Sequence, residues 1–203
     1  MTAPAQNVYV VDDDAAVRRS LKRLLSTAGF AVETFGSADA LLARGAPCGA
    51  ACLVLDVRMP GMTGPQLFER MSECGLAMPV VFLTGYGDVP TGIRAMKGGA
   101  VDFLLKPVDG EALLRAVRDA IGRDAVRLQE AQEREDVRSR LSALSPRERQ
   151  VLADVVRGLP NKLTAADLGI SEKTVKVHRH RIMAKTGVGS LAELVRLVDA
   201  AGQ

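Results

Sequence analysis

The chain has 203 residues and a formal net charge of +3, a length that allows one large domain or two small domains. Only 3% of the residues are aromatic, so we expect aliphatic cores. The first residues lack the basic and apolar segments of a signal peptide, and no apolar run reaches membrane-spanning length, which predicts a cytoplasmic protein without a membrane partner.

Residues 1–122 alternate between strand-like and helix-like segments. Short apolar runs predict strands at 8–11, 30–35, 51–56, 80–83 and 101–105. Apolar residues at helical spacing predict helices at 17–25, 37–42, 64–71, 93–99 and 113–121. This strict alternation predicts an α/β domain, namely a five-stranded, parallel, doubly wound sheet of the flavodoxin-like type with helices on both faces.

Four of the five predicted strands end on or next to polar side chains, which are Asp12 with Asp13, Asp56, Thr84 and Lys106. Taken singly, each is better explained as a solvated loop residue or, for Asp56, as the cap of the next turn. Because parallel strands share one carboxyl edge, the whole set is expected to converge there. Three neighbouring carboxylates repel each other unless a cation neutralises them, and oxygen ligands without histidine or cysteine favour Mg²⁺.

These strand ends resemble the signature segments of two-component receiver domains. The segments are Val10-Val11-Asp12-Asp13-Asp14, Leu55-Asp56-Val57-Arg58-Met59-Pro60-Gly61, Leu83-Thr84-Gly85 and Leu105-Lys106-Pro107. The resemblance implies that Asp56 accepts a phosphoryl group from a sensor histidine kinase. It also implies that Asp13, Asp56 and the backbone carbonyl of Arg58 hold Mg²⁺, with Asp12 binding the ion through water.

The same resemblance implies roles for three further residues. Lys106 is expected to pair with the phosphoryl oxygens and to precede a cis bond to Pro107. The hydroxyl of Thr84 is expected to turn toward the new phosphoryl group and to let Phe103 turn inward. An ordinary core aromatic is the alternative for Phe103, which has no hydroxyl and would be moved by packing alone.

Residues 123–141 hold five basic and five acidic side chains and no glycine or proline. Their apolar stripe is thin, which predicts a solvated helical linker between a domain at 1–122 and a domain at 142–203. A dimerising coiled coil is the alternative, but sustained apolar heptads are absent from the sequence.

Residues 142–203 are the basic part of the chain, with ten basic and six acidic side chains, against 12 and 13 in residues 1–122. Helix caps are predicted at Ser145 with Glu148, Asn161, Ser171 and Ser190 with Glu193. A short helix, a glycine turn and a longer basic helix at 172–186 then form a helix-turn-helix. We therefore predict a small all-α domain that binds double-stranded DNA.

The longer helix divides by face, with Val175 and Ile182 pointing into the core. The residues that suit base edges are Lys173, Lys176, Val177 and His180. Those better placed for phosphates are Thr174, Arg179, Arg181 and Lys185. A merely solvated basic face is the alternative, and the capped turn before the helix disfavours it.

Residues 144–198 are similar to LuxR-type helix-turn-helix domains through Leu159-Pro160-Asn161-Lys162 and Gly169-Ile170-Ser171-Glu172-Lys173-Thr174-Val175-Lys176-Val177-His178-Arg179. With a receiver in front, the whole chain resembles a NarL/FixJ-type response regulator. The resemblance implies a transcription regulator that forms a homodimer when phosphorylated and works with RNA polymerase. The last helix either helps to form this dimer or only closes the core, and the sequence favours neither.

Other classes of protein fit less well. A phosphohydrolase of the haloacid dehalogenase type also uses a strand-end aspartate, but Arg58 stands where its second carboxylate belongs, so we expect no conventional enzyme. A second alternative keeps the DNA-binding part and makes the N-terminal part a small-molecule sensor, as in autoinducer-responsive LuxR proteins. It predicts an apolar pocket with aromatic walls, which this aromatic-poor domain does not suggest. A receiver that works without phosphorylation is a further alternative. The only argument against it in the sequence is that every acceptor-site residue is present.

Overall fold

The computed structural model describes residues 6–85 and 101–202, so the helix predicted at 93–99 lies outside the described residues. The chain divides into two compact units, Met1–Leu128 and Gln129–Gln203. Within the described ranges, no helix combines the length and the apolar character needed to cross a membrane.

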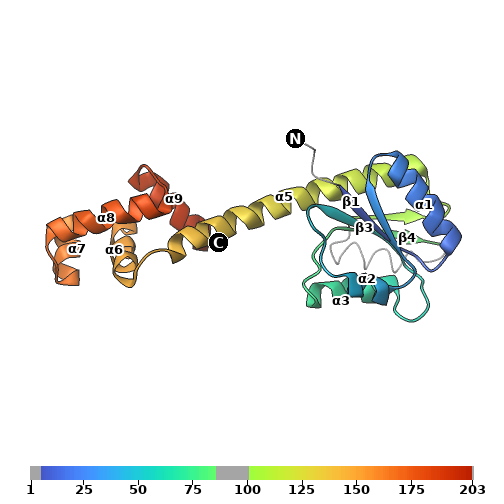
Figure 1. Ribbon diagram of the computed structural model, residues 1–203, viewed down its shortest axis with the longest axis horizontal. Helices are drawn as coiled ribbons and strands as arrows, with labels where there is room; N and C mark the ends of the chain where they lie inside the picture. Colours follow the sequence, from blue (N-terminus) through green and yellow to red (C-terminus); the bar gives the residue numbers. More distant parts are fainter. Residues whose placement is uncertain (1–5, 86–100, 203) are drawn as a thin grey trace. The chain divides into compact units, whose positions relative to one another are not determined.

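The first unit is built on a five-stranded parallel sheet (Figure 1). Its strands are β1 (Asn7–Val11), β2 (Ala31–Phe35), β3 (Ala51–Asp56), β4 (Val80–Thr84) and β5 (Asp102–Leu105). They lie in the order β2-β1-β3-β4-β5, and every neighbouring pair is parallel. This arrangement confirms the predicted doubly wound, flavodoxin-like sheet.

Helices cover both faces of the sheet (Figure 1). Among the described residues they are α1 (Ala15–Thr27), α2 (Ala38–Arg44), α3 (Gly64–Glu73) and the first part of α5 (Gly110–Ser142). Successive residues of a strand point to opposite faces, so Leu53 and Leu55 of β3 pack with α2 and α3, whereas Cys52 and Val54 pack with α1 and α5. All six residues of β3 are buried, which explains why the five residues before Asp56 form a continuous apolar run.

Helix α5 includes the segment predicted as a solvated linker, and this prediction is wrong at the first turn of that segment. The carboxylate of Asp124 is buried, and its Oδ2 accepts a hydrogen bond of 2.9 Å from the backbone N–H of Ala51, the first residue of β3. Its Oδ1 accepts one of 2.9 Å from Arg127, whose Nη2 donates to the carbonyl of Ala77 at 2.8 Å. These contacts anchor α5 at the amino end of β3.

The second unit is helical, as predicted. Its helices are the rest of α5, α6 (Pro146–Val156), α7 (Asn161–Leu168), α8 (Glu172–Thr186) and α9 (Leu191–Gly202). Val175 and Ile182 are fully buried among the side chains of its core, which confirms the predicted inner face of α8. Short helices bury too little surface to be stable alone, so this common core holds them together.

Most predicted caps of the second unit are present. Ser145 and Glu148 form the predicted capping box, and the hydroxyl of Ser171 accepts a hydrogen bond from the backbone N–H of Thr174. The cap predicted at Asn161 is wrong, because Asn161 is already the first residue of α7. Its Oδ1 instead accepts a hydrogen bond of 3.0 Å from Arg179, which ties α7 to α8.

Candidate functional site

The four predicted strand ends meet at the carboxyl edge of the sheet. The register pairs Val11 of β1 with Leu55 of β3, so the residues that follow, Asp12 and Asp56, stand side by side. Strands β1 and β3 also flank the point where the strand order reverses, which is where open α/β sheets bind ligands. Thr84 ends β4, next to β3.

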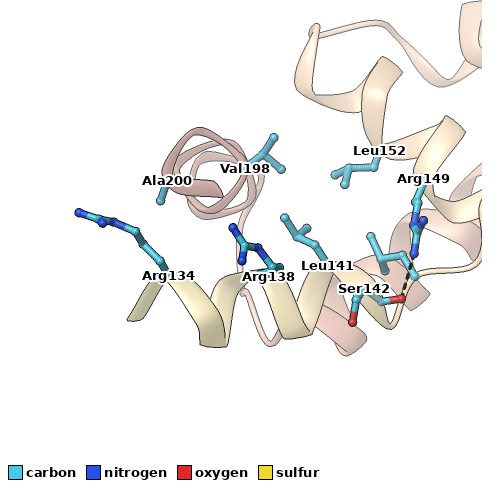
Figure 2. Close-up of a pocket in the computed structure, with 9 residues that line it drawn as sticks. Arg134, Arg138, Leu141, Ser142, Arg149, Leu152, Val198 and Ala200 are labelled. Atoms are coloured by element: carbon cyan, nitrogen blue, oxygen red, sulfur yellow. Dashed lines mark hydrogen bonds between the residues drawn. The ribbon is translucent and has the colours of Figure 1, made fainter. Parts of the chain in front are cut away.

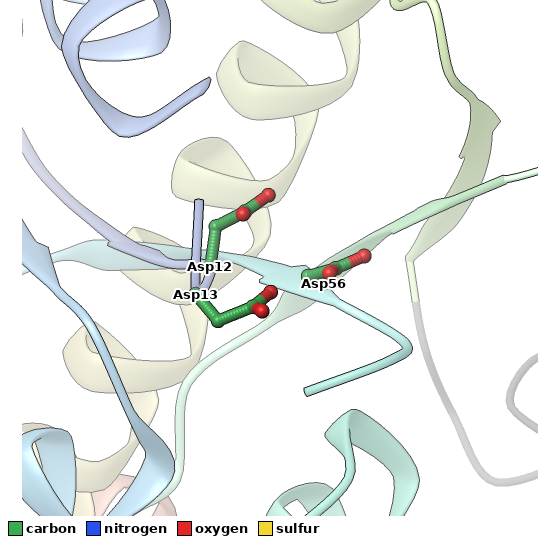
Figure 3. A group of neighbouring side chains, drawn as sticks. All are labelled: Asp12, Asp13 and Asp56. Atoms are coloured by element: carbon green, nitrogen blue, oxygen red, sulfur yellow. The ribbon is translucent and has the colours of Figure 1, made fainter. Parts of the chain in front are cut away.

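Three carboxylates lie together at this edge (Figure 3). One carboxylate oxygen from each of Asp12, Asp13 and Asp56 lies within 4.8 Å of the other two. Asp12 and Asp56 are buried, whereas Asp13 is exposed to solvent. Burial is the main reason that the pKa of Asp56 is raised, and the negative charge of Asp12 adds to it.

Lys106 partly neutralises this cluster. Its Nζ donates a hydrogen bond to Asp12 Oδ2 at 2.7 Å and lies 3.1 Å from Asp56 Oδ1. Burial alone would lower the pKa of Lys106, but the two carboxylates outweigh burial and raise it above its ordinary value. The ammonium therefore stays charged beside two acidic groups. The bond from Lys106 to Pro107 is cis, as the resemblance implied.

The third aspartate of the first signature segment has a different task. Asp14 is the N-cap of α1, and its Oδ1 accepts hydrogen bonds from the backbone N–H groups of Ala16 and Val17 at 2.7 and 3.4 Å. These bonds lower the pKa of the Asp14 carboxyl. In turn, the backbone N–H of Asp14 donates to Asp12 Oδ1 at 2.9 Å, which orients one carboxylate of the cluster.

The remaining residues predicted for this site are Thr84, Arg58 and Phe103. The hydroxyl of Thr84 is buried and donates to the carbonyl of Gly85 at 3.1 Å. A backbone hydrogen bond from Arg58 reaches the Asp56 carboxylate. Phe103 is half-buried on β5, with its ring centroid 6.4 Å from that of Phe82.

The sequence gives no role to Gly64 beyond starting a helix, yet Gly64 touches the central aspartate. A Cβ atom at this position would lie 2.3 Å from the backbone oxygen of Asp56, so only glycine fits there. The N–H of Gly64 also donates to the carbonyl of Val57 at 3.0 Å. The Gly-Pro pair at 64–65 marks a helix start, but no spacing rule reveals such a close approach.

The second unit presents the outer face of α8 as a candidate nucleic-acid interface. The predicted base-reading residues are all exposed, namely Lys173, Lys176, Val177 and His180, and Arg181 is exposed as well. Val177 is 42% exposed, so its apolar side chain is available for contact on this basic face. The arrangement therefore offers both charge and an apolar contact to a polyanion.

The other predicted phosphate contacts have partners within the protein. Arg179 is bound to Asn161, and the hydroxyl of Thr174 lies 2.8 Å from that of Ser171. The ammonium of Lys185 donates to Glu148 Oε2 at 2.8 Å and to the carbonyl of Ala143 at 3.1 Å. Lys185 is the main reason that the pKa of Glu148 falls to about 2. Lys185 therefore fixes the end of α8 to the start of α6.

Comparison with known proteins finds one family match in each part of the chain. Residues 8–118 match the family described as "Response regulator receiver domain", and residues 142–198 match "Bacterial regulatory proteins, luxR family". The transcriptional regulatory protein FixJ of Azorhizobium caulinodans is 48% identical over 195 residues, which cover 96% of this chain and 92% of that protein. Response regulator protein TodT of Pseudomonas putida is 43% identical over 201 residues, 98% of this chain and 88% of that protein.

A solved structure extends the similarity to the fold. The response regulator StyR aligns with a TM-score of 0.90 and 48% identity, over 96% of this chain and 98% of StyR. The two family matches follow one another along the chain as the two sites do. The chain thus belongs to the NarL/FixJ-type response regulators, transcription regulators in which a receiver domain precedes a LuxR-type DNA-binding domain.

Proposed function

We propose that phosphorylation of Asp56 controls the binding of this regulator to double-stranded DNA. The observation that carries the proposal is the set of contacts around Asp56, whose carboxylate is clustered with Asp12 and Asp13 and lies 3.1 Å from the ammonium of Lys106. A nucleophile beside a fixed cation, at the ligand-binding edge of the sheet, suits acceptance of an anionic group.

The phosphoryl donor is a phosphohistidine of the sensor kinase. An oxygen of Asp56 forms the new P–O bond as the P–N bond breaks, and the departing imidazole takes a proton. A carboxylate needs no deprotonation before it attacks, and Lys106, 3.1 Å from Asp56 Oδ1, would pair with the oxygens of the arriving group. Positioning and charge stabilisation are most of what phosphoryl transfer requires. The protein has no conventional enzymatic turnover beyond its own phosphorylation and slow dephosphorylation.

The carboxylate cluster fits Mg²⁺, because hard oxygen donors within 4.8 Å of each other suit this ion. Asp13, Asp56 and the backbone carbonyl of Arg58 would hold it directly, and Asp12 would bind it through water. When bound, Mg²⁺ offsets the repulsion between the carboxylates and an incoming phosphoryl group.

Phosphorylation then shifts an existing equilibrium toward a receiver that pairs with a second copy. The hydroxyl of Thr84 exchanges the carbonyl of Gly85 for a phosphoryl oxygen, and Phe103 turns into the space that Thr84 leaves. The homodimer places two α8 helices on adjacent half-sites of DNA. In the cytoplasm, it acts together with RNA polymerase.

The proposed DNA interface consists of the outer face of α8. Lys173, Lys176, Val177 and His180 face base edges, while Thr174, Arg179 and Arg181 lie toward phosphates. Lys185 is not part of this proposed interface, because its ammonium donates a hydrogen bond to Glu148.

Replacing Lys176 with alanine is expected to weaken binding to an operator by about 10- to 100-fold, the usual worth of one good base contact. The operator is obtained by in vitro selection with the wild-type protein, and affinity is measured by fluorescence anisotropy. Lys22→Ala removes the same charge from the exposed side of α1 and should leave affinity unchanged. An unaltered operator affinity for Lys176→Ala removes Lys176 from the reading face.

The proposed function is tested by treating the protein with Mg²⁺ and acetyl phosphate, or with beryllofluoride. We expect one phosphoryl group per chain by mass, a larger dimer fraction by ultracentrifugation, and DNA affinity raised about 5- to 150-fold, the usual range of coupling between two sites. A protein that takes up the phosphoryl group without a change in DNA affinity contradicts the control mechanism. A protein that takes up none contradicts the acceptor site.

A further inference from the structure

A groove of about 610 Å³ opens in the second unit, between the last turns of α5 and helices α6 and α9 (Figure 2). Its volume lies within the range of sites for small organic ligands. All of its described lining residues belong to the second unit. Neither the phosphoacceptor site nor the exposed face of α8 includes any of them.

The floor of the groove is apolar. Leu141 of α5, Leu152 of α6 and Val198 of α9 line it and also belong to, or pack against, the core of the second unit. Because these side chains belong to or pack against the core, the core supports the floor from below. A ligand with an apolar body gains free energy by covering such a surface.

Three arginines form the rim, at Arg134, Arg138 and Arg149. The first two are one helical turn apart on α5 and therefore lie on the same side as Leu141 (Figure 2). Arg149 approaches from α6, where its Nη2 donates to the carbonyl of Ser142 at 3.0 Å. Among the described residues that line the groove, none is acidic.

The guanidinium groups on α5 are only loosely held by other charges. Arg134 and Arg138 each meet a glutamate of their own helix at 3.5 Å, and their side chains are 63% and 78% exposed. Exposed pairs of this kind contribute little, so both groups can turn to a better acceptor at small cost. A carboxylate or sulfonate that they reach together would accept several charge-assisted hydrogen bonds.

We propose that this groove is a binding site for a small amphipathic organic anion, with its apolar body on Leu141, Leu152 and Val198 and its acidic group between the rim arginines. An inorganic anion would leave the apolar floor uncovered. A neutral hydrophobic molecule would leave the charged rim unpaired. The groove matches both parts of the amphipathic ligand.

The probe for this site is 8-anilino-1-naphthalenesulfonate, followed by fluorescence titration of the full-length protein. The matched neutral probe is N-phenyl-1-naphthylamine, which has the same rings without the sulfonate. Arg138→Gln is expected to weaken binding of the sulfonate by about tenfold, the loss of one charge-assisted hydrogen bond. The same substitution should change binding of the neutral probe by less than about twofold.

The control variant is Arg196→Gln, which removes an exposed arginine of α9 outside the groove. It should leave the affinities for both probes unchanged. Equal losses in Arg138→Gln and Arg196→Gln would mean a general charge effect and would overturn the site. So would equal binding of the two probes without any effect of Arg138→Gln. Loss of sulfonate binding as the protein dimerises at high concentration would show that a second copy occupies the groove, and would also overturn the proposal.

Discussion

Asp56→Asn is expected to abolish phosphorylation of the protein by acetyl phosphate and by a sensor kinase. The amide has the shape of the carboxylate but lacks its negative charge, so it offers no nucleophile to phosphorus. Burial and Asp12 raise the pKa of Asp56, which means that its charge is unfavourable in the fold. We therefore expect the melting temperature to change by no more than about 2–4 °C, equivalent to about 1 kcal/mol for a chain of this size.

The measurement is intact-protein mass spectrometry after incubation with acetyl phosphate and Mg²⁺. Asp119→Asn is the matched control, because Asp119 lies on the exposed side of α5. The control should be phosphorylated like the wild type. Phosphorylation that persists in Asp56→Asn would assign the acceptor to another residue, and a large fall in melting temperature would mean that Asp56 serves the fold instead.

Gly64→Ala is expected to damage both the fold and phosphorylation, although it adds only one methyl group. The new Cβ would lie 2.3 Å from the oxygen of Asp56 and 3.1 Å from the Cα of Val57, and both are backbone atoms that must move to make room. Overpacking of this kind costs about 1–3 kcal/mol. A shift of Asp56 by about 1 Å should slow phosphorylation by about 100-fold.

Urea denaturation and the rate of phosphorylation by acetyl phosphate measure the two effects of Gly64→Ala. The same exchange at Gly122 is the control, because a Cβ there would have no neighbour within 4 Å and the residue lies in α5. Gly122→Ala should stabilise the protein by about 0.5–1 kcal/mol through its better helix propensity. If Gly64→Ala is as stable and as reactive as Gly122→Ala, the loop after β3 adapts without disturbing Asp56.

The sheet and the carboxylate cluster could be predicted from the sequence because both follow from local patterns. A strand buried on two faces has a continuous apolar run, as in 51–55, and parallel strands bring their carboxyl ends to one edge. The sequence therefore predicts that Asp12, Asp56 and Lys106 lie together. The exposed and buried faces of α8 follow in the same way from a period of 3.6 residues.

Contacts between distant segments could not be predicted in this way. Periodicity places Lys185 on α8 but does not reveal that Glu148, 37 residues earlier, takes its ammonium. Residue type predicts Asn161 as a cap but does not reveal that its Oδ1 accepts a hydrogen bond from Arg179 of α8. The requirement for glycine at position 64 could not be predicted either. It comes from the close approach of the backbone of Asp56, which the neighbouring strands hold in place.

The burial of Asp124 changes where the receiver can be cut. A fragment that ends after Gly122 keeps all five strands but loses both the acceptor for the N–H of Ala51 and the guanidinium that binds the carbonyl of Ala77. The first strand residue of β3 and the loop before β4 would then exchange their amide protons faster and fray at low denaturant. A fragment that extends past Arg127 keeps the hydrogen bonds of Asp124 and Arg127. The two fragments should therefore differ in amide exchange and in fraying, although their sheets have the same sequence.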